Sequence, residues 1–315
     1  MAVTTDETNR PLVGIFFIVF GMSCITVNDL LVKLLSDRYS LHQIVFIRSL
    51  FGISFSLLMV QFEGGWSILK TSRPGRHALR GGLIVVTNIT FFMAIAAMPI
   101  GEATAIFFVA PLMISLLSIP MLGERVGPRR LIAVVIGFCG VLVMMRPGTE
   151  SAGILTALMP VAAALTYALF QLMTRQLGGQ AKASAMAVYV QGMFLIVAIA
   201  IGAVVGDGRY AHHFENPSLV FLFRPWIWPL AEDYALFAGL GVISAIIAYA
   251  LSQAYRSAAA ATVAPFEYVA LPLATMWGYL IWHDVPDMRA WSGMALILGA
   301  GLYVLARERR KKAET

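Results

Sequence analysis

Residues 111–130 read PLMISLLSIPMLGERVGPRR, and residues 271–290 read LPLATMWGYLIWHDVPDMRA. With a shift of 160 residues (271 − 111), the early proline, the acid and the arginine of each stretch coincide to within one residue: Pro111 with Pro272, Glu124 with Asp284, and Arg129 with Arg289. Weaker matches pair Gly14-Ile15 with Gly153-Ile154 and Ile47-Arg48 with Val190-Gln191. An apolar helix with a similar polar exit thus occurs twice, which indicates an internal duplication.

The amino-acid composition indicates the environment in which this duplicated chain folds. Of its 315 residues, 59% are apolar and 13% are charged, whereas soluble domains average about 45–50% and about 25%. So little charge excludes a soluble enzyme, a nucleic-acid-binding domain and a disordered chain. The two cysteines, Cys24 and Cys139, lie inside apolar runs and do not form a disulfide framework. Apolar runs of about 20 residues follow one another, so we predict an all-α polytopic membrane protein.

The apolar runs predict ten transmembrane helices. The predicted spans are roughly 12–35, 41–62, 79–97, 102–121, 128–146, 153–174, 184–205, 234–255, 262–282 and 288–306. An even number places both termini on one side, and sixteen of the 23 Lys and Arg residues then fall on that side against five on the other. This positive-inside bias predicts cytoplasmic termini in a bacterial-type inner membrane, with lipid around the spans. The N-terminus lacks a basic region and a cleavage site, so we expect the first span to be retained.

The duplication also predicts the domain organisation. We expect an N-terminal tail (1–11), a first repeat of five helices (12–146), a second repeat of five helices (153–306) and a basic C-terminal tail (307–315), with a long external loop at 206–233. Because five is odd, the second repeat enters the membrane from the opposite face. Inverted repeats around a central cavity are typical of secondary transporters, whose binding sites lie near the bilayer midplane between the repeats.

Several motifs resemble a known family. They are GERVGPRR (123–130) and APFEYVALPLATMWGYLIWHD (264–284), with NDLLVKLL (28–35), FIRSLFG (46–52) and RPGRHALRGG (73–82). Together they resemble the EamA-type carriers of the drug/metabolite transporter superfamily, most closely bacterial members tied to riboflavin or S-adenosylmethionine uptake and more distantly aromatic amino-acid exporters. The resemblance implies ten helices, a central cavity and alternating access. The chain departs from the usual pattern where His283-Asp284 replaces the second Gly-Glu pair.

Ionisable residues inside spans are the first candidates for function, since each costs at least about 2.5–3.5 kcal/mol at a helix centre on insertion scales. Asp29 and Lys33 are four residues apart, so they either neutralise one another or serve the solute. Arg48 has no acid one turn away, and its partner is another helix or a carboxylate or phosphate of the solute. Glu267 either exchanges a proton, meets a cationic group of the solute or pairs with Arg256.

Uncharged polar and aromatic residues supply the remaining candidates. Tyr and Gln recur at i,i+4 spacing on two predicted helices, and Asn88 lies three and four residues before a Phe pair. Such stripes suit a solute with a flat ring and hydrogen-bonding edges, or else hydrogen bonds between helices. The predicted substrate-binding residues are Asn28, Lys33, Arg48, Asn88, Phe92, Phe108, Tyr167, Gln171, Tyr249, Gln253 and Tyr268. The predicted coupling or gating residues are Asp29, Glu267, Pro111 and Pro272.

These observations predict a secondary active transporter that moves a small ring-containing metabolite (a vitamin, a nucleoside-derived or an amino-acid-like solute) across the inner membrane. The alternative is an exporter of amino acids or drug-like compounds; an intramembrane enzyme or a channel is more remote, since GxSxG and HExxH motifs are missing. We expect no catalysis, cofactor, metal or nucleic-acid partner. Protons are a hypothetical coupling ion. The solute, the direction of transport and a homodimer are left open.

Overall fold

The structure, a computed structural model, describes residues 11–123, 128–145, 154–177, 181–257 and 263–313, and all regular elements in these ranges are helices. The long helices are α1 (Pro11–Ser36), α2 (Leu41–Glu63), α3 (Pro74–Ala97), α6 (Pro128–Met145), α7 (Ile154–Leu177), α8 (Ala183–Val205), α10 (Tyr234–Ser257) and α13 (Met288–Ala313). Shorter helices are α4 (Ile100–Phe107), α5 (Ala110–Leu122), α9 (Pro217–Phe223) and α12 (Ala270–Trp282). Four short 3₁₀ segments are η1 (Trp66–Leu69), η2 (Ala211–His213), η3 (Ala231–Asp233) and η4 (Ala264–Val269).

Seven stretches among the described residues are long and apolar enough to cross a membrane: α1, α2, α3, the α4–α5 stretch, α7, α8 and α10. The chain is therefore a multi-pass helical membrane protein. The ten-helix arrangement is not established by this count. The predicted span 128–146 is α6, whose apolar part is only Leu131–Met144. The predicted span 262–282 divides into η4 and the 13-residue α12, and the predicted span 288–306 lies within α13.

Two of the predicted spans are interrupted beside a proline. α4 ends at Phe107 and α5 begins at Ala110, with Pro111 in its first turn. Similarly, η4 ends at Val269 and α12 begins at Ala270, with Pro272 in the first turn of that helix. Proline lacks the N–H that would continue the hydrogen-bond ladder, but it is well tolerated in a first turn. Both interruptions of the α-helix therefore lie just before the two stretches quoted at the outset, at matching positions of the duplication.

The third helix begins earlier than the sequence predicts. The expected start was residue 79, but α3 begins at Pro74, which occupies its first turn. Proline at this position has no N–H to leave unsatisfied, and its φ angle is already helical. The five additional residues matter because they place Arg80 in the second turn of a membrane-spanning helix, whereas the predicted span has it at its second residue.

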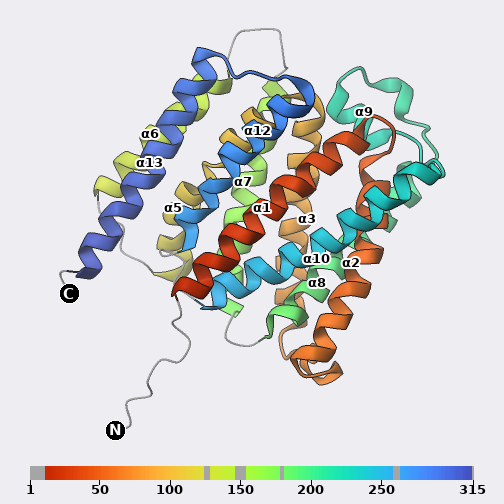
Figure 1. The fold of residues 1–315 in the computed structure, drawn as a ribbon, viewed down its shortest axis with the longest axis horizontal. Coiled ribbons are helices and arrows are strands. Elements are labelled where there is room, and N and C mark those ends of the chain that lie inside the picture. The colour runs from red at the N-terminus through yellow and green to blue at the C-terminus, as the bar shows by residue number, and fades with distance from the viewer. Residues whose placement is uncertain (1–10, 124–127, 146–153, 178–180, 258–262, 314–315) are drawn as a thin grey trace.

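The helices form a bundle in which four pairs make the most extensive contacts: α1 with α10, α3 with α7, α2 with α8 and α6 with α13. Figure 1 shows α6 and α13 side by side at one edge, with α2, α8 and α10 toward the other edge. The α6–α13 pair is close because glycines face one another: a Cβ on Gly140 would lie 2.9 Å from the carbonyl oxygen of Gly293. Small residues are the usual device for close helix packing in membranes.

One end of the bundle is covered by residues 206–233, which we call the cap segment; α9 is part of it. The Gln43 amide makes two hydrogen bonds to the backbone of Ile227, with Nε2 donating to the carbonyl oxygen at 2.5 Å and Oε1 accepting from the N–H at 3.2 Å. The Tyr39 hydroxyl donates to Asp233 Oδ2 at 2.5 Å. Arg224 Nη1 donates to the carbonyl oxygen of Ser36 at 2.6 Å. The cap segment is thus fastened to the ends of α1 and α2.

Candidate functional site

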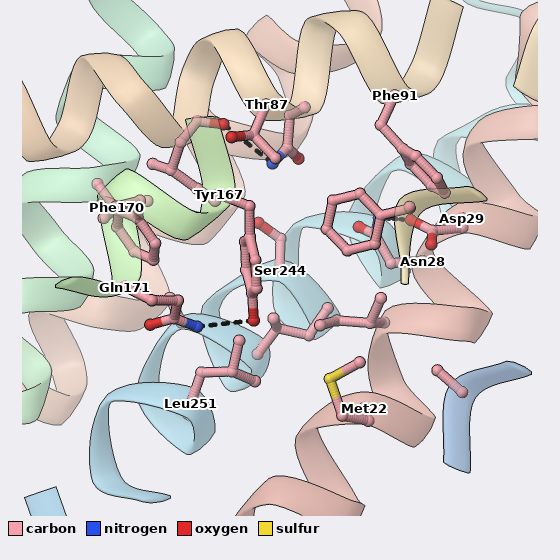
Figure 2. Close-up of a pocket in the computed structure, with 18 of the residues that line it drawn as sticks. Met22, Asn28, Asp29, Thr87, Phe91, Tyr167, Phe170, Gln171, Ser244 and Leu251 are labelled. Atoms are coloured by element: carbon pink, nitrogen blue, oxygen red, sulfur yellow. Dashed lines mark hydrogen bonds between the residues drawn. The ribbon is translucent and has the colours of Figure 1, made fainter. Parts of the chain in front are cut away.

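A cavity of about 1120 Å³, including its part open to solvent, lies in the centre of the bundle. Its walls come from α1, α2, α3, α4, α7, α8, α10 and α12, and Figure 2 shows side chains from several of these helices converging on it. Its polar lining consists of Thr26, Asn28, Asp29, Arg48, Arg80, Thr87, Asn88, Thr104, Tyr167, Gln171, Thr174, Gln191, Ser244 and Ser252.

Arg48 is the centre of a buried polar cluster in this cavity, with only 2% of its surface exposed. Its Nη1 donates to Asn28 Oδ1 at 3.4 Å, and its Nη2 donates to Asn88 Oδ1 at 3.1 Å. The guanidinium also lies over two rings, 5.1 Å from the centre of Phe92 and 4.7 Å from that of Phe194. Three helices therefore hold the Arg48 fork, and the two rings exclude water from its faces.

Asp29 adds a negative charge to the Arg48 cluster. Asn28 links the two, since its Nδ2 donates to Asp29 Oδ1 at 3.1 Å while its Oδ1 accepts from Arg48. Asp29 is 7% exposed and interacts electrostatically with Arg48. The ion pair with Lys33, one of the two predicted alternatives, is not formed. Lys33 Nζ instead donates to the carbonyl oxygen of Met98 at 3.0 Å and lies 4.7 Å above the Trp282 ring, outside the cavity lining.

Gln191 lies in the cavity wall on α8 and was not among the predicted site residues. Its Nε2 donates to Ser244 Oγ at 2.8 Å, whereas its buried Oε1 has no hydrogen-bond partner in the described part of the chain. The predicted match of Ile47-Arg48 with Val190-Gln191 contained the signal that would have found it, because both pairs contribute to the lining.

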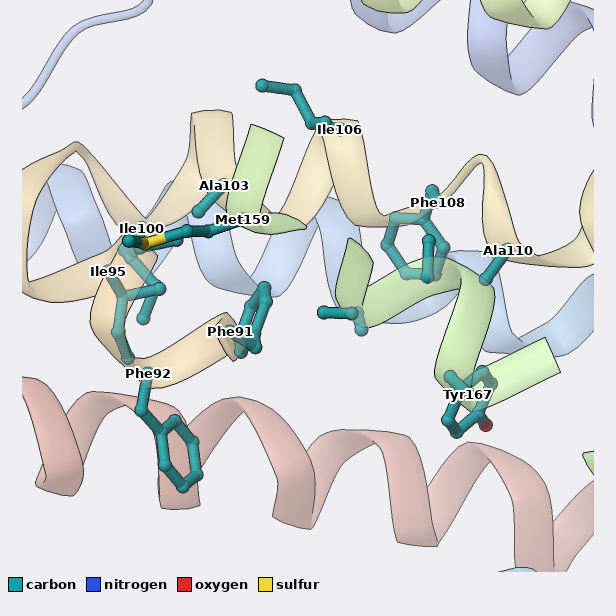
Figure 3. Close-up of a cluster of buried hydrophobic side chains, with 14 of the residues drawn as sticks. Phe91, Phe92, Ile95, Ile100, Ala103, Ile106, Phe108, Ala110, Met159 and Tyr167 are labelled. Carbon is teal, nitrogen blue, oxygen red and sulfur yellow. The ribbon is translucent and has the colours of Figure 1, made fainter. Parts of the chain in front are cut away.

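Aromatic rings form another wall of the cavity. The Phe107 ring centre lies 5.2 Å from both Phe91 and Tyr167, so α3, α4 and α7 meet at these rings. Figure 3 shows Phe91, Phe108 and Tyr167 beside the aliphatic side chains of the buried core. Such a surface presents flat apolar faces, and offset or edge-to-face stacking suits a conjugated ring.

Glu267 lies immediately behind this wall and is 1% exposed. Its Oε1 accepts hydrogen bonds from the hydroxyl of Tyr167, at 3.3 Å, and from the hydroxyl of Tyr255. Gln171 Nε2 donates in turn to the Tyr167 oxygen at 2.6 Å. Because Tyr167 and Gln171 line the cavity while Glu267 does not, a hydrogen-bonded chain connects the cavity to a buried carboxyl group. The alternative pairing with Arg256 involves a side chain outside the described part of the structure.

The remaining predicted residues lie around the cavity without lining it. Tyr249 packs edge-on against Phe17 of α1, with ring centres 6.1 Å apart, and Gln253 follows one turn later on α10. Tyr268 packs against Phe108 at 5.2 Å. Pro111 and Pro272 lie in the first turns of α5 and α12. The structure therefore brings Asn28, Asp29, Arg48, Asn88, Phe92, Phe108, Tyr167 and Gln171 together, and leaves Lys33, Tyr249, Gln253, Tyr268 and Glu267 outside the lining.

Arg80 is a cavity residue that the sequence analysis missed, since it was counted only among the sixteen basic residues of the cytoplasmic side. Its side chain is 1% exposed. Its Nε donates to Thr174 Oγ1 at 2.8 Å, and the guanidinium lies 4.7 Å above the Phe170 ring. The signal was present in Pro74: a proline six residues earlier marks a helix start and places Arg80 in the second turn.

The fold and this cavity define the class: a multi-pass helical membrane protein with a buried cavity of mixed polar and aromatic lining. Within the described residues, no group of three or more His, Cys, Asp and Glu side chains is placed to hold a metal ion. Residues 12–146 match the EamA-like transporter family. Together with the relatives described next, this match shows that the chain is similar to EamA-type carriers of the drug/metabolite transporter superfamily, which supports a transporter of small metabolites.

Three relatives cover most of the chain. A riboflavin transporter of Rhizobium johnstonii is 29% identical over 97% of this chain and 95% of its own. An S-adenosylmethionine uptake transporter of Rickettsia felis is 27% identical over 97% and 96%. A riboflavin transporter of Vibrio cholerae is 29% identical over 77% and 75%. One protein of known crystal structure is similar at a TM-score of 0.65 over 96% of this chain and 98% of that chain; at 18% identity it shows a common fold.

Proposed function

We propose that this protein is a secondary active transporter that carries a small ring-containing metabolite across the bacterial inner membrane by alternating access. The observation that supports this most directly is the central cavity, in which the Arg48 cluster lies beside an aromatic wall. Burying charged groups inside a membrane protein is expensive, and such groups usually serve the transported species. The termini are proposed to be cytoplasmic, as the distribution of Lys and Arg predicts.

The cavity favours a solute with both a conjugated ring and hydrogen-bonding edges. Phe91, Phe107 and Tyr167 offer stacking surface, while the amides of Asn88 and Gln171 offer donors and acceptors. Riboflavin and S-adenosylmethionine, for which relatives are named, each combine a fused ring with a polar chain. We therefore propose flavin-like or nucleoside-derived metabolites as the solute class.

The pairing of helices supports two inverted repeats. If 12–146 and 153–306 are equivalent, exchanging them converts the α1–α10 contact into the α3–α7 contact, and these two are equally extensive. The α2–α8 and α6–α13 contacts convert into themselves. A structure built in this way has two related conformations, because each repeat adopts the arrangement of the other, and the cavity then opens to the opposite face.

Glu267 is the proposed coupling group, with Asp29 as a second candidate. Protonation of Glu267 would remove the negative charge that Tyr167 and Tyr255 now stabilise with hydrogen bonds. Because Tyr167 also lines the cavity, a change at Glu267 would move a ring that the solute contacts. Under this proposal, solute and proton influence each other through Tyr167.

The test is transport by purified protein in liposomes. Radiolabelled riboflavin and S-adenosylmethionine are offered to liposomes with and without the same unlabelled solute inside, and with and without an imposed pH gradient. We expect saturable uptake of at least one solute, stimulation by the internal solute, and at least a tenfold loss of kcat/KM in Arg48→Gln. The matched control is Arg73→Gln, which removes an exposed charge before α3.

Each outcome bears on one part of the proposal. Uptake that rises linearly with solute concentration would indicate a channel and refute the carrier mechanism. The absence of flux for both solutes would refute the proposed solute class. Uptake that ignores the pH gradient in the wild type would refute proton coupling and leave facilitated exchange.

A further inference from the structure

Arg80 is a buried cation without a carboxylate partner among the described residues. The part of the chain that the structure describes places no carboxylate within ion-pair distance of its guanidinium, and the only polar partner there is the Thr174 hydroxyl, which accepts from Nε. Its Nη1 is buried without any hydrogen-bond partner in that part of the chain. The titratable neighbour that interacts with Arg80 is His77, one turn earlier on α3, and an imidazole supplies no negative charge. Arginine remains ionised in proteins, so this charge is permanent.

Arg48 differs from Arg80 in its Nη atoms and in its neighbouring charge, although its Nε is also buried without a hydrogen-bond partner among the described residues. Asn28 and Asn88 accept from both of its Nη atoms, and Asp29 provides a nearby negative charge through Asn28. The charged groups that line the cavity are thus Asp29, Arg48 and Arg80, and the last is left over. A buried donor without a partner costs more than a satisfied one gains, so the empty Arg80 fork calls for an acceptor from outside the protein.

The orientation of Arg80 is fixed by α7. The Thr174 hydroxyl donates to the carbonyl oxygen of Phe170 at 2.8 Å while it accepts from Arg80 Nε at 2.8 Å. The Phe170 ring lies beneath the guanidinium plane. With Nε engaged and one face covered, the two Nη atoms form a free fork, which matches the two oxygens of a carboxylate or a phosphate.

The two arginines lie toward opposite ends of the cavity. Asn88, which binds Arg48, follows Arg80 by eight residues on α3, which corresponds to about 12 Å along the helix axis. In Figure 2, Phe170 and Gln171 lie on one side of the cavity, Asn28 and Asp29 lie on the other, and Tyr167 stands between them. A solute whose ring stacks near Tyr167 would therefore extend one end toward Arg80 and the other toward the Arg48 cluster.

We propose that Arg80 binds an anionic group, a carboxylate or a phosphate, on the transported solute, with Thr174 as a positioning residue. The proposal rests on the proposed transport function and narrows it: the solute carries a ring and at least one negative charge at its end near α7. The two ends of the cavity would then favour different solute groups. The Arg80 end suits an anion, whereas the Arg48 cluster contains its own negative charge and suits hydrogen-bonding or zwitterionic groups.

The experiment compares binding of matched pairs that differ by one anionic group. The pairs are riboflavin 5′-phosphate with riboflavin, S-adenosylmethionine with its decarboxylated form, and tryptophan with tryptamine. Dissociation constants are measured by calorimetry on purified full-length protein in detergent. We expect the anionic member of at least one pair to bind about tenfold or more tightly, the effect of one charge-assisted hydrogen-bonded pair. Arg80→Gln should reduce this preference to about twofold or less.

Matched variants distinguish binding from structural effects. Arg76→Gln removes an exposed arginine one turn earlier on α3 and should retain the full preference. Arg80→Lys keeps the charge and should retain part of it. Thr174→Val should weaken the preference while leaving the affinity for the uncharged partner unchanged, and Thr174→Ser should restore it. If Arg80→Gln does not fold, the preference for the anionic ligand is measured in Arg80→Lys and in the Thr174 variants instead.

The outcomes separate this proposal from the transport function. If no anionic member binds better than its partner, or if the preference survives in Arg80→Gln, the Arg80 subsite is refuted. Saturable uptake of a solute in liposomes would still support the carrier in that case. If an Arg80-dependent preference is found but no flux occurs, the binding subsite stands and the transport mechanism is refuted.

Discussion

The Arg48 cluster makes a quantitative prediction about charges inside the membrane. Arg48 and Asp29 are nearly fully buried, and Asn28 joins them by one hydrogen bond to each. The hydrogen bonds alone are worth little, since polar contacts between transmembrane helices average about 0.6 kcal/mol. An uncompensated charge inside a span, however, costs at least about 2.5–3.5 kcal/mol on insertion scales. The charge balance should therefore dominate over the hydrogen bonds.

We expect Arg48→Gln to destabilise the protein by about 3 kcal/mol, because it leaves the Asp29 carboxylate without a cation. Asp29→Asn should destabilise it by a similar amount, because it leaves the guanidinium without an anion. The double variant contains neither charge and should lose only about 1 kcal/mol, the hydrogen-bond and packing part. The predicted coupling energy is thus about 5 kcal/mol and favours the pair.

The assay is thermal unfolding of the purified protein in detergent, followed by tryptophan fluorescence at constant protein and detergent concentrations. At about 2 °C per kcal/mol for a chain of this size, each single variant should melt about 6 °C below the wild type and the double variant about 2 °C below it. Additive shifts, with the double variant least stable of all, would refute the reasoning that the two charges compensate one another. Asn28→Ala should fall between these cases, because it removes the link and leaves both charges.

Three further predictions concern other parts of the molecule. Glu267→Gln should retain solute counterflow but abolish the response of uptake to an imposed pH gradient; a variant that still responds to the gradient would exclude this residue as the coupling group. Gly140→Ala should destabilise the fold by about 1–3 kcal/mol, because its Cβ meets the facing α13 backbone. The Cβ of Gly299→Ala would meet nothing within 4 Å, so this variant should stabilise the fold by up to about 1 kcal/mol. Equal melting temperatures of the two variants would contradict the packing argument. Gln43→Ala removes both hydrogen bonds to Ile227 and should open the cap segment. Opening is measured as faster maleimide labelling of a cysteine introduced at the cavity, in a background without the two native cysteines. An unchanged labelling rate would show that these hydrogen bonds do not hold the cap segment closed.

Much of the site could be predicted from the sequence because polar residues are conspicuous in an apolar span. Asn28, Arg48, Asn88 and Gln171 were selected on this ground, and the structure places all four in the cavity lining. The transport and binding measurements proposed above test whether these four residues bind the solute. The choice between partners could not be made in the same way. Lys33 is one turn from Asp29 in sequence, yet its ammonium group reaches the Met98 carbonyl, since the position of α3 relative to α1 is set by packing between helices.

The recurrence of the same residue spacing on two helices was also a partial guide. Tyr167 with Gln171 and Tyr249 with Gln253 have the same spacing, but only the first pair lines the cavity. The rotation of each helix about its own axis decides which face points inward, and spacing along one helix contains no information about that rotation. In α10, Ser244, Leu251 and Ser252 face the cavity instead.

The sequence by itself determined the membrane environment, the helical class and the resemblance to a transporter family. Composition and the length of apolar runs are properties of the chain that do not depend on how the helices pack. The tertiary structure alone decided which charges are compensated. Arg48 and Arg80 look alike in sequence, but one meets two amides and a carboxylate across helices while the other keeps its fork free. Electrostatic compensation depends on distances between segments far apart in the chain, and those distances exist only once the helices have packed.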